Sequence, residues 1–533
     1  MASLTLMILT LLATLLSVCG AESVATRSQQ SPNIVVILCD DLGYGDVRCL
    51  NPAGKIATPN LDRLAADGVM MTDAHSPSGV CTPTRYGLLT GRYSWRSRLQ
   101  RGVQGGMSPP LIAPDRLTIA SLLKQQGYTT GCFGKWHLGM EWALKERAPA
   151  FADGIELGMD GWRVDFEKPI SRGPLTAGFD EYFGISASLD MVPYTFIRQN
   201  KVAAIPTVNK AFPMMLGKPK HDTRRGPAAE DFEAHDVLPS LTREACSFIA
   251  RHAPAAKQGK PFFLDLPLAA PHTPIAATAE WQGRSGINPY ADFVMQTDAA
   301  IGAVLASLAE HNVDQQTLVI VTSDNGCSPE ADFAALRKHG HNPNYHFRGH
   351  KADLYEGGHH VPFFARWPGK ISAGSRSDRV ICLVDLMATF AQIVGTELPA
   401  NAGEDSSSML DAWQITPITG PAKAASSVVA REAIVHHSVN GSFAIRQKNW
   451  KLLLTGDSGG WSDPKPGSKA AQNQPLVQLY DLATDPGERQ NLQAEHPEIV
   501  ERLTKLLERY VQEGRSTPGP TQKNDVVVQI WKK

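Results

Sequence analysis

The chain has almost no net charge and few cysteines for its length. Its 533 residues include 52 Lys and Arg against 53 Asp and Glu, which gives a formal net charge of −1. Such a balance gives no electrostatic reason to expect a nucleic-acid or anionic-membrane partner. Eight scattered cysteines exclude a disulfide scaffold. The sequence allows one or two disulfides without indicating which cysteines would pair.

Long apolar runs are also scarce. The run Leu4–Val18 is shorter than the about 20 residues that span a bilayer, so we expect no stable membrane span. Residues 1–20 carry no charged side chain, and small residues precede Glu22. We therefore predict a signal peptide at residues 1–21, cleaved near Ala21, in preference to an uncleaved anchor. The mature protein would be secreted or periplasmic, or lysosomal in a eukaryote.

The length predicts two domains, because 533 residues exceed one ordinary hydrophobic core. Residues 403–425 are rich in Ser, Gly, Pro and Ala and have no clear periodicity. We place the boundary there, with a large domain at 33–415 and a smaller one at 416–533. Apolar periodicity predicts helices at 60–67, 117–126, 240–251, 291–311, 382–394 and 498–512, a strand at 361–367, and a hairpin formed by 442–446 and 450–454.

Two predicted buried strands end in acidic residues. Asn33–Cys39 is followed by Asp40-Asp41, and Thr317–Thr322 by Ser323, Asp324 and Asn325. Carboxylates at the end of a buried strand are costly unless they bind a cation. The alternative is a solvated turn, where Asp is common. An oxygen-only ligand set suits calcium or magnesium.

Two further predicted strands lead into basic side chains. The strand at 128–133 precedes Lys135 and His137, which are two apart and therefore share a side in an extended segment. The strand at 261–267 precedes His272, which is held between prolines. In an open α/β sheet, ligands gather outside the carboxyl ends of the strands. These residues should therefore converge on one pocket.

Cys81 starts the segment Cys-Thr-Pro-Thr-Arg, in which Pro83 suits a first helical turn. Cys81 would then lie at a helix N-terminus, which favours negative charge, with Arg85 on the same face and Gly91 ending the helix. A cysteine at such a place could also be a small buried hydrophobe.

This Cys-x-Pro-x-Arg segment and the following Leu-Leu-Thr-Gly resemble the signature of type I sulfatases, which belong to the alkaline phosphatase superfamily. Gly134–Gly139 (GKWHLG) is similar to a second motif of that family, and at least five such motifs lie in order between about Asn33 and Leu492. The resemblance implies an α/β fold with a large mixed β-sheet flanked by helices. A smaller C-terminal α+β domain of antiparallel sheet and helix would follow.

The resemblance also implies the active-site residues. A formylglycine-generating enzyme would oxidise Cys81 to formylglycine, the catalytic group, and calcium rather than magnesium would be the bound ion. The implied metal ligands are Asp40, Asp41, Asp324, Asn325 and the oxidised Cys81. Arg85 and Lys135 would hold charge, His137 would be the base, and His272 or Lys351 the acid. The implied substrate-binding residues are Ser188, with Ser186 as its competitor, Lys135, His272 and Lys351.

The implied activity is sulfuric ester hydrolysis, with a sulfated carbohydrate or an aryl sulfate as substrate. The alternatives are a phosphate or phosphonate monoester hydrolase of the same superfamily and a non-catalytic binder of sulfated glycans. Segments 141–177, 198–236 and 330–344 would determine specificity. We further expect an anion-lined pocket from four basic residues crowded in one stretch: His346, Arg348, His359 and His360.

Overall fold

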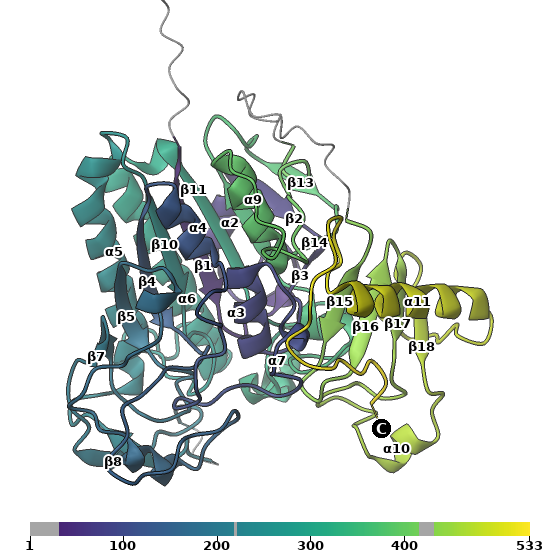
Figure 1. The fold of residues 1–533 in the computed structure, drawn as a ribbon, viewed down its shortest axis with the longest axis horizontal. Helices are drawn as coiled ribbons and strands as arrows, with labels where there is room; N and C mark the ends of the chain where they lie inside the picture. The colour runs from purple at the N-terminus through teal and green to yellow at the C-terminus, as the bar shows by residue number, and fades with distance from the viewer. Residues whose placement is uncertain (1–30, 218–220, 415–430, 533) are drawn as a thin grey trace, which may run out of the picture. The chain divides into compact units, whose positions relative to one another are not determined.

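The computed structural model describes residues 31–217, 221–414 and 431–532. The predicted signal peptide and residues 415–430 at the predicted domain boundary lie outside the described residues. From Pro32 on, the described residues pack as one unit, shown in Figure 1.

The main sheet has ten strands. Its core strands are nearly continuous runs of Val, Ile, Leu and Phe, as expected for strands covered on both faces. In spatial order the strands are β13 (Ser375–Ser377), β2 (Val69–Met71), β12 (Phe363–Arg366), β11 (Thr317–Ser323), β1 (Asn33–Cys39), β10 (Phe262–Pro267), β4 (Thr129–Lys135), β5 (Glu181–Ile185), β6 (Ile197–Arg198) and β7 (Lys201–Val202).

Strand β1 lies at the centre of this sheet and pairs in parallel with β10 and β11. Strand β4 pairs in parallel with β10 and β5, whereas β12 runs antiparallel to β11. The carboxyl ends of β1, β10, β11 and β4 therefore meet at one edge of the sheet. This edge carries the acidic and basic residues that follow the predicted strands.

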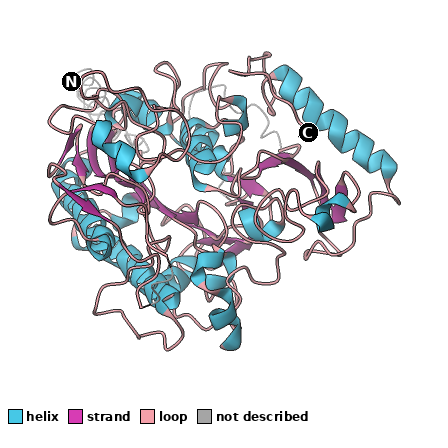
Figure 2. Cartoon of the chain, turned by 90° about the horizontal axis from the view of Figure 1, so that it is seen from below, coloured by secondary structure: helices cyan, strands magenta, loops and turns pink. Residues whose placement is uncertain are grey.

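Helices cover both faces of the main sheet (Figures 1 and 2). On one face α6 (Pro289–Glu310) packs against α5 (Val237–Ala256) and α2 (Pro59–Ala66). On the other face α9 (Leu386–Ile393) packs against α3 (Cys81–Thr90) and α4 (Ile119–Gln125). The shorter elements are α7 (Phe333–Lys338), α8 (Glu356–His359), α10 (Lys469–Gln472), the pair β3 (Ala74–His75) and β14 (Ile381–Cys382), and the pair β8 (Val208–Lys210) and β9 (Gly226–Ala228).

A smaller antiparallel sheet follows, with the order β15 (Ile434–His437), β16 (Phe443–Gln447), β17 (Trp450–Leu453) and β18 (Gln478–Asp481). Helix α11 (Pro497–Glu513) packs on β16 and β17. Leu503, Leu507 and Tyr510 recur at helical spacing and bury the inner face of α11. The predicted combination of a large mixed sheet and a smaller antiparallel sheet with a helix is confirmed.

One predicted helix begins later than expected. The segment 382–394 starts with β14 and a single 3-10 turn, and α9 begins only at Leu386. Asp385 is the reason, because its carboxylate accepts the backbone N–H of Cys382 at 2.9 Å and also contacts the Arg431 guanidinium. The Cys382 N–H and the Arg431 guanidinium compensate the burial of the Asp385 carboxylate. The bond from Asp385 back to Cys382 also holds residues 382–385 in a turn before the helix.

Helix α6 is the one helix in the described ranges that is long and apolar enough to cross a membrane, by length and composition only. It is mostly buried, and its Asp298 accepts hydrogen bonds from Asn60 and from the Leu61 backbone. These contacts make α6 a core helix of this fold. The seven cysteines in the described residues are all free, so the structure forms no disulfide among them.

A buried polar network joins the two sheets. Lys451 on β17 is fully buried, with Nζ 2.9 Å from Glu356 Oε1 and 2.8 Å from Glu488 Oε1. His359 Nε2 lies 3.0 Å from the same ammonium group, and His360 contacts the other oxygen of Glu356 at 2.9 Å. One lysine is therefore shared by two carboxylates between the sheets, and burial together with the neighbouring Glu356 raises the pKa of Glu488 to about 7.

This network corrects the expectation of an anion-lined pocket. His359 contacts Lys451 of the C-terminal sheet, whereas His360 lies 2.9 Å from the Thr72 carbonyl oxygen and stacks on Phe347. Arg348 donates to the Glu488 carbonyl oxygen at 2.7 Å while stacking on Tyr355. His346 packs against neighbouring aromatic rings. Basic residues that are close in sequence need not point toward the same pocket. Here their side chains form internal hydrogen bonds and aromatic contacts.

Replacing Lys451 should destabilise the fold strongly. Lys451→Met leaves Glu356 and Glu488 buried without their shared cation, which costs about 3–5 kcal/mol of unfolding free energy. Urea denaturation followed by fluorescence would measure this loss. Lys505→Met is the matched control, because Lys505 pairs with Glu501 on the exposed face of α11 and its loss should leave the midpoint unchanged. Equal midpoints for the wild type and Lys451→Met would contradict the assignment.

Candidate active site

Cys81 is the first residue of α3, as predicted. The preceding Val80 is extended, and Gly91 closes the helix in the left-handed conformation at φ 62°. Cys81 is only 3 % exposed. Burial raises the pKa of its thiol, and Lys135 and Lys351 offset only part of that rise. The unmodified side chain is therefore a neutral thiol at the positive end of a helix.

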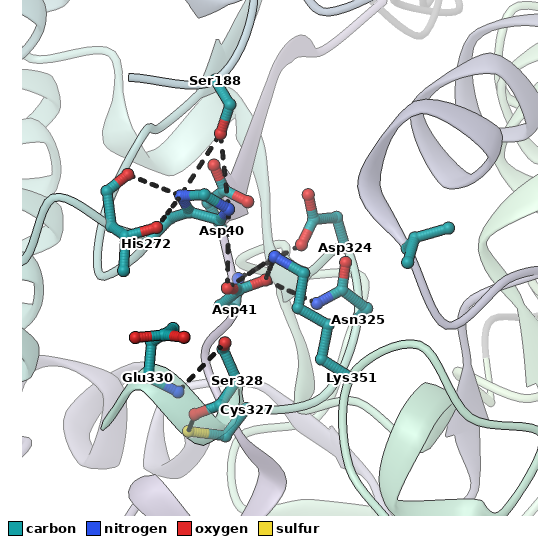
Figure 3. A network of polar contacts seen from close by, with 12 residues as sticks. Asp40, Asp41, Ser188, His272, Asp324, Asn325, Cys327, Ser328, Glu330 and Lys351 are labelled. Carbon is teal, nitrogen blue, oxygen red and sulfur yellow. Dashed lines mark hydrogen bonds and ion pairs between the residues drawn. The ribbon is translucent and has the colours of Figure 1, made fainter. Parts of the chain in front are cut away.

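The four predicted acidic and amide ligands converge at the ends of β1 and β11 (Figure 3). The backbone N–H of Asp41 donates to Asp324 Oδ1 at 3.2 Å. Asn325 Nδ2 donates to Asp41 Oδ1 at 2.7 Å. Single carboxylate oxygens of Asp40 and Asp324 and the sulfur of Cys81 all lie within 4.8 Å of one another. Parallel pairing of β1 with β11 places these residues together.

Three cationic side chains match the three carboxylates. Lys135 Nζ lies 2.6 Å from Asp40 Oδ2, and Lys351 Nζ lies 2.7 Å from the Asp41 carboxylate. Arg85 donates to Asp324 Oδ2 at 2.8 Å. Every member of this set is at most 5 % exposed.

Electrostatics divides the carboxylates. Burial alone would raise the pKa of Asp40, but Lys135, His272 and Arg85 together hold that pKa well below its ordinary value. For Asp324, burial and the neighbouring Asp40 raise the pKa, and Arg85 does not offset them. Asp40 is therefore ionised, whereas Asp324 holds a proton more readily than an ordinary aspartate.

The cluster fits a hard divalent cation. Asp40 Oδ1 and Asn325 Oδ1 are buried and have no hydrogen-bond partner. Buried oxygens without a donor are costly, and oxygen ligands are those that calcium and magnesium prefer. Asp40, Asp41 and His272 form a second overlapping group that could hold an ion.

His137 is held as a neutral imidazole. Its Nε2 lies 2.7 Å from the Gln104 carbonyl oxygen, which can only accept, so Nε2 carries the proton. Burial, Lys135 and Arg85 lower the pKa of His137 well below its ordinary value. Its Nδ1 is buried without a partner and is therefore a free base.

Ser188 connects the remaining predicted residues. Its hydroxyl lies 3.2 Å from Lys135 Nζ and 3.2 Å from His272 Nδ1. Ser186 instead uses its backbone carbonyl to accept the His137 N–H at 3.0 Å. Of the two serines, Ser188 is the one whose side chain faces the cluster. His272 Nε2 lies 3.7 Å from Asp41 Oδ2 (Figure 3).

Comparison with known proteins identifies the family. Residues 32–396 match the Sulfatase family model. The chain belongs to the sulfatase family. An N-acetylgalactosamine-6-O-sulfatase of Bacteroides thetaiotaomicron is 32 % identical to this sulfatase, with 90 % of this chain and 93 % of the relative covered. Human arylsulfatase A is 31 % identical, with 92 % of this chain and 90 % of the relative covered.

A solved structure supports the same assignment. A protein described in the metabolism of multiple glycosaminoglycans by Bacteroides thetaiotaomicron superimposes with a TM-score of 0.75 at 31 % identity, covering 90 % of this chain and 99 % of that one. The fold of this sulfatase is therefore alkaline-phosphatase-like. The chain is an enzyme that hydrolyses sulfate esters.

A cavity of about 1260 Å³ opens over Cys81 in this sulfatase. Ser188, His272 and Lys351 line its floor. All three predicted specificity segments reach its wall, through residues that include Asp153, Met214, Arg224, Glu330, Phe333 and Arg337.

Sequence reasoning missed two other parts of the cavity wall. One is the stretch 98–103, which follows α3, and the other is residues 461–465 of the C-terminal region. Neither stretch carries a motif. Trp461 lines the cavity, but the sequence does not indicate which elements the segment around it packs against. Gln104, which sets the His137 tautomer through its backbone, had no sequence signal at all.

Proposed function

We propose that this sulfatase removes sulfate from sulfated carbohydrates outside the cytoplasm. The name of the Bacteroides relative supports a sugar substrate. The apolar run at the N-terminus supports export, to the exterior or periplasm, or to the lysosome in a eukaryote. The active form would carry formylglycine at position 81, made by a formylglycine-generating enzyme, and one calcium ion. Magnesium is the second choice.

The observation that carries the proposal is the position of Cys81 between the helix N-terminus and the carboxylate cluster. Asp40, Asp41, Asp324 and Asn325 would hold the ion together with the modified residue 81. The cation would supply Lewis-acid stabilisation of negative charge, and formylglycine would supply a hydroxyl nucleophile on a carbon that can re-form an aldehyde. The oxygen-only protein ligands favour calcium over zinc.

The surrounding residues would bind the sulfate group and move protons. Ser188 and Lys351 line the cavity, and Lys135 lies behind them with Nζ 3.2 Å from the Ser188 hydroxyl. All three would bind sulfate oxygens. Arg85 fixes the geometry, because it bridges the Asp324 carboxylate and the Lys135 carbonyl oxygen. His137, with its free Nδ1, would act as the base. His272 or Lys351 would protonate the departing alcohol.

Residue 81 should be modified in active enzyme. Intact-peptide mass spectrometry after co-expression with a maturation enzyme should find the peptide of Cys81 lighter by about 18 Da, a change outside the ordinary cysteine oxidation ladder. The peptides of the buried Cys132 and Cys382 are internal controls and should keep their unmodified mass. A fully active preparation that contains only cysteine at position 81 would overturn this part of the proposal.

Calcium should stabilise the wild type and not the Asp324→Ala variant. An ion that binds only the folded state adds RT ln(1 + c/Kd) to the free energy of unfolding, where c is its free concentration, so the melting temperature rises with the logarithm of free calcium above its dissociation constant. Differential scanning calorimetry with added calcium, after chelation, measures this directly, and chelation should also abolish sulfate release. Glu330→Gln is the control, because Glu330 is an exposed carboxylate of the same cavity. Equal calcium responses in wild type and Asp324→Ala would exclude the site.

The acid residues should matter most for poor leaving groups. A sugar alkoxide needs a proton, whereas 4-nitrophenolate leaves without one, so general-acid assistance of about 10²-fold or more should be lost only on sugar sulfates. His272→Ala and Lys351→Ala are compared on both substrates by steady-state kinetics. Equal losses on the two substrates would contradict the assignment. Faster hydrolysis of 4-nitrophenyl phosphate than of the sulfate by wild type would contradict the proposed function.

A further inference from the structure

A second charged pair lies in the wall of the cavity, beside the residues already assigned. Asp190 follows Ser188 by two positions and is 8 % exposed. Arg224 Nη1 lies 2.7 Å from Asp190 Oδ2 and 3.3 Å from the Asp190 carbonyl oxygen. Both residues line the cavity together with Cys81 and His272. The mechanism described above uses neither.

This pair has unused hydrogen-bonding capacity. Asp190 Oδ1 is buried and has no hydrogen-bond partner. Burial would raise the pKa of Asp190, but His272, Arg224 and the nearby Ser188 hydroxyl outweigh burial and lower it, so the carboxylate is ionised and only accepts. The contacts of Arg224 with Asp190 use only Nη1, and the Arg224 side chain is 36 % exposed, so its other N–H groups are accessible to a ligand. The pair thus offers an acceptor and several donors.

The two loops that carry the pair are fixed to each other. The hydroxyl of Tyr194, which is 1 % exposed, lies 2.5 Å from the Arg224 carbonyl oxygen and 3.4 Å from that of Asp190. The backbone N–H of Met191 donates to the Ser188 carbonyl oxygen at 3.0 Å, which closes a turn around Asp190. Because the pair is held before substrate arrives, little ordering cost would accompany binding.

Another ion pair of the same cavity shows what a satisfied carboxylate looks like. Arg98 donates to both oxygens of Asp153, at 2.7 and 3.1 Å, and Gln104 donates to one of them at 3.0 Å. Asp153 therefore has a partner on each oxygen. The unpartnered oxygen of Asp190 is a difference between two otherwise similar pairs.

We propose that Asp190 and Arg224 form a hydroxyl-binding subsite for the sugar ring that carries the sulfate ester. Asp190 Oδ1 accepts a hydrogen bond from one ring hydroxyl, and Arg224 donates to the same or a neighbouring oxygen. The proposal rests on the carbohydrate substrate proposed above. A substrate without that hydroxyl leaves a buried charged acceptor unpaired, so the pair selects against it.

The competing explanation is that Asp190 acts only through Ser188 and His272, as a positioning residue for the acid. Both explanations predict a smaller effect on an aryl sulfate. They differ on sugars that lack one hydroxyl. A subsite gives a loss that disappears when the hydroxyl is absent, whereas a positioning role gives the same loss on every sugar.

The test compares kcat/KM for wild type, Asp190→Ala and Arg224→Ala on matched substrates. The parent substrate is the sugar sulfate that wild type hydrolyses best among monosulfated N-acetylgalactosamines, starting with the 6-sulfate, and the partners are its mono-deoxy analogues. Removing a hydrogen bond to a charged group should cost about 10- to 100-fold on the parent. Wild type should lose a similar factor on one deoxy analogue. On that analogue Asp190→Ala should lose no more than about twofold further.

Matched variants make the result specific. Asp153→Asn removes a charge from the same cavity, but both oxygens of Asp153 already have hydrogen-bond partners. The ratio of kcat/KM on the parent to kcat/KM on each deoxy analogue should therefore be the same for Asp153→Asn as for wild type. Asp190→Asn and Arg224→Lys keep the packing where the alanine variants do not fold. The wild-type comparison of deoxy analogues needs no variant, and equal kcat/KM on parent and all analogues would overturn the subsite.

The remaining outcomes separate this inference from the proposed function. Equal losses for Asp190→Ala on parent and every deoxy analogue would overturn the subsite and establish the positioning role, while sugar hydrolysis itself stands. A wild-type enzyme that hydrolyses 4-nitrophenyl sulfate but no sugar sulfate would overturn both the substrate class and the subsite.

Discussion

The active centre depends on the mutual neutralisation of charges buried at one edge of the sheet. Asp40, Asp41 and Asp324 bring three negative charges to the ends of β1 and β11, and Lys135, Lys351 and Arg85 bring three positive ones. Removing one member of such a set leaves an uncompensated buried charge. The protein side chains alone sum to zero, so a bound divalent cation would leave the site at +2 and attractive to an anionic sulfate ester.

The sheet topology makes this arrangement possible. Parallel pairing of β1 with both β10 and β11 brings residues separated by almost 300 positions to the same edge. Helix α3 adds Cys81 at its N-terminus, where the backbone dipole reinforces the cations. The Lys451 network lies outside this centre and joins the second sheet to the first through the segment that also carries Lys351.

The residues that sequence reasoning located are those whose position follows from a strand end or a helix start. Asp40, Lys135, Asp324 and Cys81 were predictable because burial, strand direction and helix capping act locally. The Asp190–Arg224 pair was not, because its two halves belong to different loops that come together only in the folded chain, through their own ion pair and through Tyr194. The predicted anion-lined pocket around residues such as His359 was wrong, because the density of basic residues along a sequence does not indicate which way each side chain points.

The centre and the wall of the cavity are mechanically connected through one short turn. Ser188 contacts Lys135 and His272 of the centre, and Asp190 belongs to the same turn and to the wall. A change in the backbone of this turn would therefore shift Ser188, and with it the hydrogen bonds of His272, whereas a side-chain change at Asp190 that keeps the turn alters only the wall. Insertions or deletions in this turn would thus affect substrate preference and acid catalysis together. Residues 461–465 belong to the cavity wall but lie away from this turn, and within the described ranges they make no hydrogen bond or ion pair with the charge cluster. Substitutions there can therefore change substrate preference without disturbing the catalytic residues.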